Sequence, residues 1–336
     1  MKKKIKINFK YFGPVFNPED NFFTNILREI YDVEISSNPD YMFYSVYPET
    51  KGEVKDLSKK GDFIKKISPY LYILLRKVYS KFKILITKNK PLVPKGDFIK
   101  IFYNSEHVKP NMKECDWAFA THFEEDINNP RYMRIPLILK NDYQLKNLGL
   151  PPIIKKINLK KIKREKKRFC NFIYSQDVFE RNKFFETLSK YKHIDSPGRC
   201  MTNMPPIKGK NAKESRLSYN WVLDKLDFLK EYKFTIAFEN FSSPGWVTEK
   251  LTHPMLVNSI PIYVGHKDVS KEFNTKSFIN YNDFRSMKEF IDFIIKVDND
   301  DKLYEKILNE PWYKENNLPR DWDINRIKKR FKDIFG

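Results

Sequence analysis

The fold is decided by the stretch Tyr232-Lys-Phe-Thr-Ile-Ala-Phe-Glu-Asn240, Phe241-Ser-Ser-Pro-Gly-Trp246, Val247-Thr-Glu-Lys250 and, shortly after it, Ile260-Pro-Ile-Tyr-Val-Gly265. The apolar run at its start is typical of a buried strand, and the Ser, Pro and Gly residues that follow are typical of a turn. A helix is expected to begin near Val247, and a second apolar strand follows at the end of the stretch. The pattern therefore predicts a strand, a turn, a helix and a strand, the unit from which parallel α/β sheets are built.

Polar side chains end the first strand of this unit and open its helix. Glu239 and Asn240 stand at the strand end, and Glu249 and Lys250 stand in the first helical turn. In a parallel sheet that helix presents unpaired N–H groups and partial positive charge beyond the strand's carboxyl end. A cation beside free amides suits a diphosphate, and a carboxylate in the same turn suits the two hydroxyls of a ribose. The residues therefore predict a nucleotide-binding site.

The same motifs resemble those of a known family. Phe238-Glu-Asn240, Val247-Thr-Glu-Lys250, Ile260-Pro-Ile-Tyr-Val-Gly265 and Lys276-Ser-Phe-Ile-Asn280 closely resemble the α-1,3/4-fucosyltransferases of glycosyltransferase family 10, and the bacterial members most. The resemblance covers most of residues 98–313. It implies an α/β chain with the GT-B fold, in which two Rossmann-like domains face each other across a cleft, one for the nucleotide sugar and one for the acceptor.

The composition is that of a folded chain with a basic excess. Its 336 residues allow two domains, and 41% hydrophobic content with 15% aromatic residues argues against disorder. Lys and Arg outnumber Asp and Glu by 63 to 43, which gives a net charge of +20. This excess favours phosphates, nucleic acid or an acidic membrane surface as partners, although a lysine-rich solvated surface explains it equally well.

The cysteines and the apolar runs indicate the compartment. Cys115, Cys170 and Cys200 are odd in number and widely spaced, which suits a reducing environment better than a disulfide framework. The basic N-terminus alternates apolar and charged residues like a strand, unlike a signal peptide, and no run approaches the roughly 20 apolar residues of a membrane span. We therefore expect a cytoplasmic protein, with the inner face of the membrane as a second location.

The order of predicted elements divides the chain into three parts. Alternating strands and helices give two domains, at 1–154 and 155–320. The resemblance implies that both are Rossmann-like, with the N-terminal domain binding the acceptor and the C-terminal domain binding the nucleotide sugar. Residues 321–336 form an amphipathic helix that is expected to pack back on the first domain. The basic run at 155–168 reads as a solvated linker, with peripheral contact to an anionic or lipid-linked surface as the alternative. A helix is also expected near 64–79, and Asp177 is expected to cap another.

Glu106 is the candidate general base. It follows the predicted strand at 97–103 by a few residues, and open α/β sheets carry functional residues at such strand ends. Asn104-Ser-Glu-His107 resembles the family's Gly-Glu-Asn motif, whose glutamate is the presumed base, with Ser105 and His107 as departures. The alternatives are a surface-loop glutamate at this position and Glu239 as the base.

The remaining candidates hold the donor. Lys250 and Arg181, on the helix after the second domain's first strand, are expected to contact the diphosphate, because arginine suits a phosphate whose charge grows in the transition state. Glu249 is expected at the ribose and Asn240 at the sugar or phosphate. Trp246 either faces the donor or packs the turn, and tyrosine is more usual there in the family. The donor-binding set comprises Arg181, Glu239, Asn240, Trp246, Val247, Thr248, Glu249 and Lys250.

The resemblance implies that the chain is an inverting α-1,3/4-fucosyltransferase that moves fucose from GDP-fucose to a hydroxyl of a GlcNAc- or Glc-containing glycan. One base and a few cations suffice, because a nucleoside diphosphate needs no acid to protonate it. No cofactor is expected, and Asp298-Asn-Asp-Asp301 is interpreted as a polar turn with a helix cap, rather than a manganese site. The alternatives are a transferase for another GDP-deoxyhexose and, with less support, a noncatalytic glycan-binding or nucleic-acid-binding protein.

Overall fold

The computed structural model describes residues 2–13, 16–47, 93–106, 108–146, 148–209 and 219–336. The helix expected near 64–79 lies outside these residues. Contacts within the chain divide it into two units. The first unit comprises Met1–Ala120, Ile127–Met133 and Arg330–Gly336, and the second comprises Thr121–Asp126 and Arg134–Lys329.

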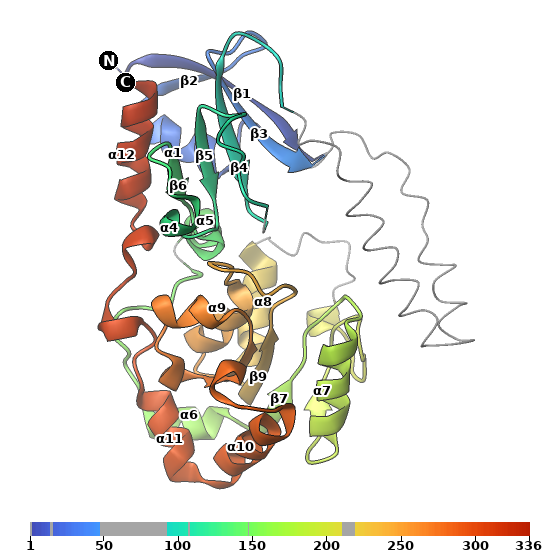
Figure 1. Cartoon of the computed structure of the whole chain (residues 1–336). Helices are drawn as coiled ribbons and strands as arrows, with labels where there is room; N and C mark the ends of the chain where they lie inside the picture. The colour runs from blue at the N-terminus through green and yellow to red at the C-terminus, as the bar shows by residue number, and fades with distance from the viewer. Residues whose placement is uncertain (1, 14–15, 48–92, 107, 147, 210–218) are drawn as a thin grey trace, which may run out of the picture. The chain divides into compact units, whose positions relative to one another are not determined.

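The first unit is built on a sheet whose described strands run in the order β2-β1-β3-β4-β5-β6. The pairs β1–β2, β1–β3, β3–β4 and β4–β5 are all parallel, as the alternation of strands and helices predicts (Figure 1). The strands are β1 Lys4–Phe12, β2 Asp32–Ile35, β3 Tyr41–Tyr47, β4 Ile99–Asn104, β5 Trp117–Ala120 and β6 Tyr132–Arg134, and the short helix α4 spans Glu124–Ile127.

Helix α1 (Phe22–Ile30) is capped by Asn21. The Asn21 side chain accepts hydrogen bonds from the N–H groups of Phe23 and Thr24. The Asn17-Pro18 pair lies before the helix, where the Pro18 carbonyl accepts from the Thr24 hydroxyl.

An aromatic cluster holds the first unit together. Phe23 of α1 packs against Phe43 of β3 and Phe119 of β5, at ring-centroid distances of 5.0 and 6.2 Å. Phe331, near the end of helix α12 (Ile324–Phe335), joins the cluster at 5.8 Å from Phe119 and has no exposed surface. The apolar face of the last helix thus contributes directly to this core.

The second unit carries a parallel sheet whose described strands run in the order β11-β10-β9-β7-β8. The strands are β7 Arg168–Asn171, β8 Ile194–Asp195, β9 Tyr232–Phe238, β10 Ile260–Val264 and β11 Ile279–Asn280. The α-helices are α5 Leu137–Gln144, α6 Leu159–Glu165, α7 Phe179–Ser189, α8 Tyr219–Leu229, α9 Glu249–Leu256, α10 Met287–Asn299 and α11 Asp301–Asn309. Short 3-10 helices span Ile207–Gly209, Lys267–Lys271, Thr275–Ser277, Tyr281–Asp283, Lys314–Asn316 and Arg320–Trp322.

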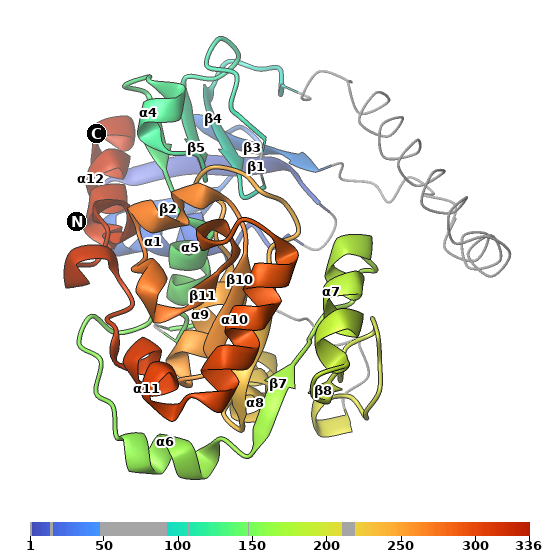
Figure 2. The same ribbon diagram turned by 60° about the horizontal axis from the view of Figure 1, so that its bottom comes forward.

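Strand β9 is buried on both faces, as its continuous apolar run predicts. Phe234, Ile236 and Phe238 point into a core shared with α7, α10 and α11. Ala237, between them, packs on the opposite face with residues of α9. Figure 2 shows α10 and α11 on one side of this sheet and α9 on the other. The alternation therefore fixes which side of the sheet carries the helix that follows β9.

The segment expected to be a solvated linker is instead part of the second unit. Residues 134–154 also group with this unit, so the contact-based division differs from the expected boundary at 154/155. The Lys166 ammonium donates to the carbonyls of Lys230 and Val257 at 2.7 Å each, where α8 and α9 end. Lys155 donates to the Glu310 carbonyl and lies over the Trp312 ring. Lys155 and Lys166 therefore stabilise the local structure by binding backbone carbonyls, which the basic composition of the segment did not predict.

Two further local expectations have different outcomes. Asp177 is not the cap of α7, whose first flanking residue is Val178; its carboxylate accepts a hydrogen bond from the Asn182 amide. Asp300 does cap α11, by accepting from Leu303 N–H at 3.0 Å. Asp298 is buried beside the ammonium groups of Lys233 and Lys192, so the acidic run is structural.

Replacing Phe331 by Ala should destabilise the first unit by about 3–5 kcal/mol, because it opens a cavity among fully buried rings. Urea-induced unfolding, followed by fluorescence, measures the loss. Lys332→Ala, at an exposed position of the same helix, is the control and should stay near wild-type stability. Equal midpoints for Phe331→Ala and the wild type would contradict the assigned core.

Candidate functional site

A buried carboxylate joins the end of β9 to the start of α9. The side chain of Glu239 has no exposed surface. It accepts hydrogen bonds from the N–H and the hydroxyl of Thr248, both at 2.8 Å. The Lys250 ammonium lies 3.4 Å from the same carboxylate and 3.2 Å from the Thr248 hydroxyl. A buried carboxylate is tolerated only when it is paired in this way, so the three side chains form one unit, which we call the Glu239 clasp.

The clasp sets the first turn of α9. Thr248 is the N-cap, with its side chain accepting from Lys250 N–H, and the helix starts at Glu249. The prediction that Glu249 and Lys250 occupy the first helical turn is confirmed, although the helix begins two residues after Val247. The N–H groups of Thr248, Lys250 and Leu251 all have acceptors within the clasp and this turn. The group that the helix start offers to a ligand is therefore the Lys250 ammonium, whose side chain is 19% exposed, at the positively polarised end of the helix.

The two carboxylates at this helix start have opposite electrostatic environments. Burial raises the pKa of Glu239, against the pull of Lys250. Burial would also raise the pKa of Glu249, but the charges of Lys250 and Lys225 outweigh it and lower the value to about 2. The side chain of Glu249 keeps 32% of its surface exposed. Glu249 is thus the ionised carboxylate with access to solvent, and Glu239 is the enclosed one.

Two titratable residues near Glu249 were missing from our sequence analysis. Lys225 comes from α8, and burial lowers its pKa while Glu249 opposes this change. His253 lies one turn after Glu249 on α9, is 3% exposed, and has its pKa lowered to about 3, first by burial and then by Lys225. Lys225 stands among many lysines in the sequence, so its type gave no signal. The spacing of His253 from Glu249, four residues on a helix, could have found it.

Arg181 lies close to the clasp but is more enclosed than expected. It is 2% exposed and stacks over the Tyr174 ring, with its guanidinium carbon 3.7 Å from the ring centroid. One terminal nitrogen donates to the Asn240 side-chain oxygen at 3.1 Å, and the other donates to the Gln176 carbonyl. The structure therefore brings Arg181 and Asn240 together at the end of β9.

The other predicted donor-binding residues differ in exposure. Trp246 is 6% exposed, and its backbone N–H donates to the Ser243 carbonyl across the turn. This burial favours the interpretation that Trp246 packs the turn over the one in which it faces the donor. Val247 packs with Leu251 and Met255 in the core, so its backbone is the part available to a ligand.

Glu106 belongs to the first unit, where it follows β4. Its N–H donates to the Asn104 side chain at 3.2 Å, which holds the residue in a tight turn. Burial raises the pKa of the Tyr47 hydroxyl, and the adjacent charge and hydrogen bond of Glu106 raise it further. A neutral phenol therefore lies beside the Glu106 carboxylate at the end of the sheet.

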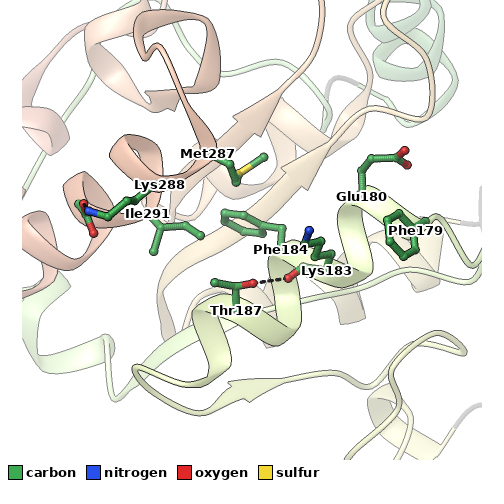
Figure 3. Close-up of a pocket in the computed structure, with 9 residues that line it drawn as sticks. Phe179, Glu180, Lys183, Phe184, Thr187, Met287, Lys288 and Ile291 are labelled. Atoms are coloured by element: carbon green, nitrogen blue, oxygen red, sulfur yellow. Dashed lines mark hydrogen bonds and ion pairs between the residues drawn. The ribbon is translucent and has the colours of Figure 1, made fainter.

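A separate cavity of about 510 Å³ lies between α7 and α10, where Figure 3 shows Phe184, Met287 and Ile291 along it. None of the predicted site residues is among the described residues that line it. Its apolar walls offer little to a diphosphate, so we do not place the donor there.

Within the described ranges, no group of three or more His, Cys, Asp or Glu side chains could hold a metal ion. None of the helices in the same ranges has the length and apolar character needed to cross a bilayer.

Comparisons with known proteins show which proteins the chain resembles. A family model described as glycosyltransferase family 10 (fucosyltransferase) C-term matches residues 162–331. The α-(1,3)-fucosyltransferase FucT of Helicobacter pylori is 32% identical over 62% of this chain and 47% of its own length. The human GDP-fucose protein O-fucosyltransferase 3 is 26% identical over 81% of this chain and 57% of its own length. The chain thus spans about half the length of these relatives.

Solved structures share the fold. A crystal structure of an α1,3-fucosyltransferase matches with a TM-score of 0.67 and 22% identity, covering 99% of this chain and 90% of that one. A structure of an α1,3-fucosyltransferase with GDP-fucose matches with a TM-score of 0.65 and 20% identity, covering 99% and 91%. The predicted α/β fold class of the GT-B type is confirmed by this likeness.

Replacing Glu249 by Gln should flatten the dependence of stability on pH between about 4.5 and 2. The folded pKa of Glu249 lies below its ordinary value of 4.5, so the unfolded chain binds the proton first as the pH falls. Its contribution to stability is thus present above about pH 4.5 and is lost as the pH approaches 2. Thermal unfolding midpoints over this window measure the slope.

The matched control for this prediction is Glu186→Gln at an exposed position of α7, which should keep the wild-type slope. If Glu249→Gln has the same slope as the wild type, the assigned environment of Glu249 is wrong.

Proposed function

Because the chain belongs to glycosyltransferase family 10, the fucosyltransferases, we propose that it transfers fucose from GDP-fucose to a hydroxyl group of an acceptor. The observation that carries the proposal is the Glu239 clasp, which lies inside the segment matched by the family and gathers an ammonium, a helix N-terminus and an ionised carboxylate. These are the groups that a nucleoside diphosphate requires.

The role of each residue that binds the donor follows from the exposure and charge of its side chain. The Lys250 ammonium, at the positively polarised start of α9, binds the diphosphate and stabilises its growing charge as the bond to fucose breaks. Arg181 and Asn240 lie next to this position and complete the phosphate contacts. Glu249 accepts hydrogen bonds from the ribose hydroxyls, because it is ionised and accessible. Thr248 supports the site by bonding to the Glu239 carboxylate through its N–H and hydroxyl, and Glu239 keeps Lys250 in place.

The reaction requires a base in addition to these groups. We propose that the Glu106 carboxylate takes the proton from the acceptor hydroxyl while that oxygen attacks the anomeric carbon of fucose. The carbon–oxygen bond to the diphosphate breaks on the opposite face, GDP leaves, and the configuration inverts. Tyr47 hydrogen-bonds the Glu106 carboxylate and orients it. This route uses no metal ion, and metal independence is part of the proposal.

The acceptor is proposed to be a glycan containing GlcNAc or Glc, fucosylated at a 3- or 4-hydroxyl. Identity to the Helicobacter pylori α-(1,3)-fucosyltransferase supports this class. A protein hydroxyl is the second candidate, favoured by the likeness to a human protein O-fucosyltransferase over 81% of the chain. Release of GDP from GDP-fucose and other GDP-deoxyhexoses, with an acceptor panel of both kinds, distinguishes these cases.

Replacing Glu106 by Gln should lower kcat by roughly 10²- to 10⁴-fold, the usual contribution of a general base, because the amide cannot accept the proton. Binding of GDP should be unchanged. Acceptor-dependent GDP release measures the first quantity, and titration calorimetry measures the second. Glu19→Gln, at an exposed position of the first unit, is the control and should keep wild-type turnover. Wild-type turnover in Glu106→Gln would remove Glu106 as the base.

Replacing Lys250 by Gln should abolish most of the thermal stabilisation that GDP gives the wild type, since ligand binding raises the unfolding temperature only where a site exists. The exposed Lys230→Gln, just after α8, is the matched control and should be stabilised like the wild type. If GDP does not stabilise the wild type, and the chain instead binds DNA or RNA with steep salt dependence, the nucleic-acid alternative replaces this proposal.

A further inference from the structure

A second set of buried charges lies under the turn that leads into α9. Arg134, the last residue of β6, has a side chain that is 1% exposed. Its guanidinium makes a two-point contact with the Glu272 carboxylate, at 2.5 and 3.0 Å. Glu272 is itself 4% exposed and accepts a further hydrogen bond from the Trp322 indole. The pair is therefore desolvated and tightly held.

The same guanidinium also holds two backbone segments. Its Nε donates to the Thr121 carbonyl at 2.9 Å, and Nη2 donates to the Gly245 carbonyl at 3.1 Å. With Asp321 at 3.3 Å, the two bonds to Glu272 and these two carbonyls, five contacts occupy the five N–H donors of arginine. Arg134 thus has no donor left for a ligand, and any effect on a ligand must pass through the segments that it holds.

Gly245 is fitted closely against Thr121. Its φ is +71°, a left-handed conformation that favours glycine, and a Cβ built there would lie 2.3 Å from the Thr121 carbonyl oxygen. The following residues, Trp246 and Val247, lead directly to the cap Thr248. The position of the Gly245 carbonyl therefore determines how the chain enters α9.

A buried ion pair is a poor source of stability, because the cost of desolvation offsets most of the attraction, and apolar residues of similar volume often serve as well. What the Arg134–Glu272 pair supplies is a fixed guanidinium aimed at two carbonyls. We propose that Arg134 is a positioning residue, which fixes the turn at 241–246 so that the first turn of α9 is preorganised for a nucleoside diphosphate. This inference rests on the proposed function, because it assumes that this turn is the GDP site.

The test removes the hydrogen bond to Gly245 without leaving a buried charge unpaired. In the double variant Arg134→Met/Glu272→Leu both charges disappear, and Asp321 keeps Arg326 at 2.5 Å. The expected result is a rise of about tenfold in the Kd for GDP, equivalent to about 1.4 kcal/mol, measured by titration calorimetry with the full chain. The stoichiometry should stay at the wild-type value, whereas partial misfolding would lower the stoichiometry and leave the Kd unchanged.

Two further variants separate positioning from general damage. Arg134→Lys keeps the charge beside Glu272 but has three donors in place of five, so its Kd should lie between those of the wild type and the double variant. Lys233→Met/Asp298→Leu removes another ion pair of the second unit, joined at 2.6 Å with the aspartate 2% exposed, and should leave the Kd for GDP unchanged.

If the double variant does not fold, Gly245→Ala tests the same contact by changing the glycine in place of the arginine. The added Cβ must displace the turn from Thr121, and the Kd should rise in the same way. A wild-type Kd in either folded variant overturns the inference and leaves the proposed function intact. Absence of GDP binding by the wild type overturns both.

Discussion

The interaction on which the candidate site depends is the burial of the Glu239 carboxylate. A carboxylate with no exposed surface must be satisfied by donors, and the donors here are the N–H and hydroxyl of Thr248 and the ammonium of Lys250. The position of Glu239 at the end of β9 therefore fixes where α9 begins, because Thr248, the cap of that helix, must bond to it. The positively polarised start of α9 and the Lys250 charge are held together by that requirement, before any ligand binds.

A second interaction holds the same turn, through the carbonyl of Gly245. Glu239 fixes the residues after the turn, and the guanidinium of Arg134 fixes Gly245 within it. Both devices bury charge, which adds little net stability but determines geometry closely, because each charged group accepts few arrangements of its partners. The turn between β9 and α9 is therefore held at Gly245 and at Thr248, which fixes the position of Lys250 at the start of the helix.

Much of the fold follows from the sequence, because apolar periodicity reports directly on which side chains are buried. The runs at β9 and β10 predicted their strands. The site was predicted in part: the motif gave Glu249 and Lys250, but it did not show that Glu239 is enclosed or that Trp246 is core. Burial and the partners of a charge depend on distant residues, which is also why Arg134 gave no signal.

The opposite environments of the two carboxylates separate their roles. The Glu239 carboxylate has no exposed surface and its bonded donors enclose it, so a sugar hydroxyl has no access to it, which makes Glu239 unsuitable as a ribose ligand or as a base. Glu249 retains exposed surface, and the charges of Lys250 and Lys225 keep it ionised. The Lys250 ammonium lies 3.4 Å from the Glu239 carboxylate and 3.9 Å from that of Glu249, so the charges of the two carboxylates are coupled through it. In the proposed function, the ribose and phosphate contacts therefore depend on one shared ammonium.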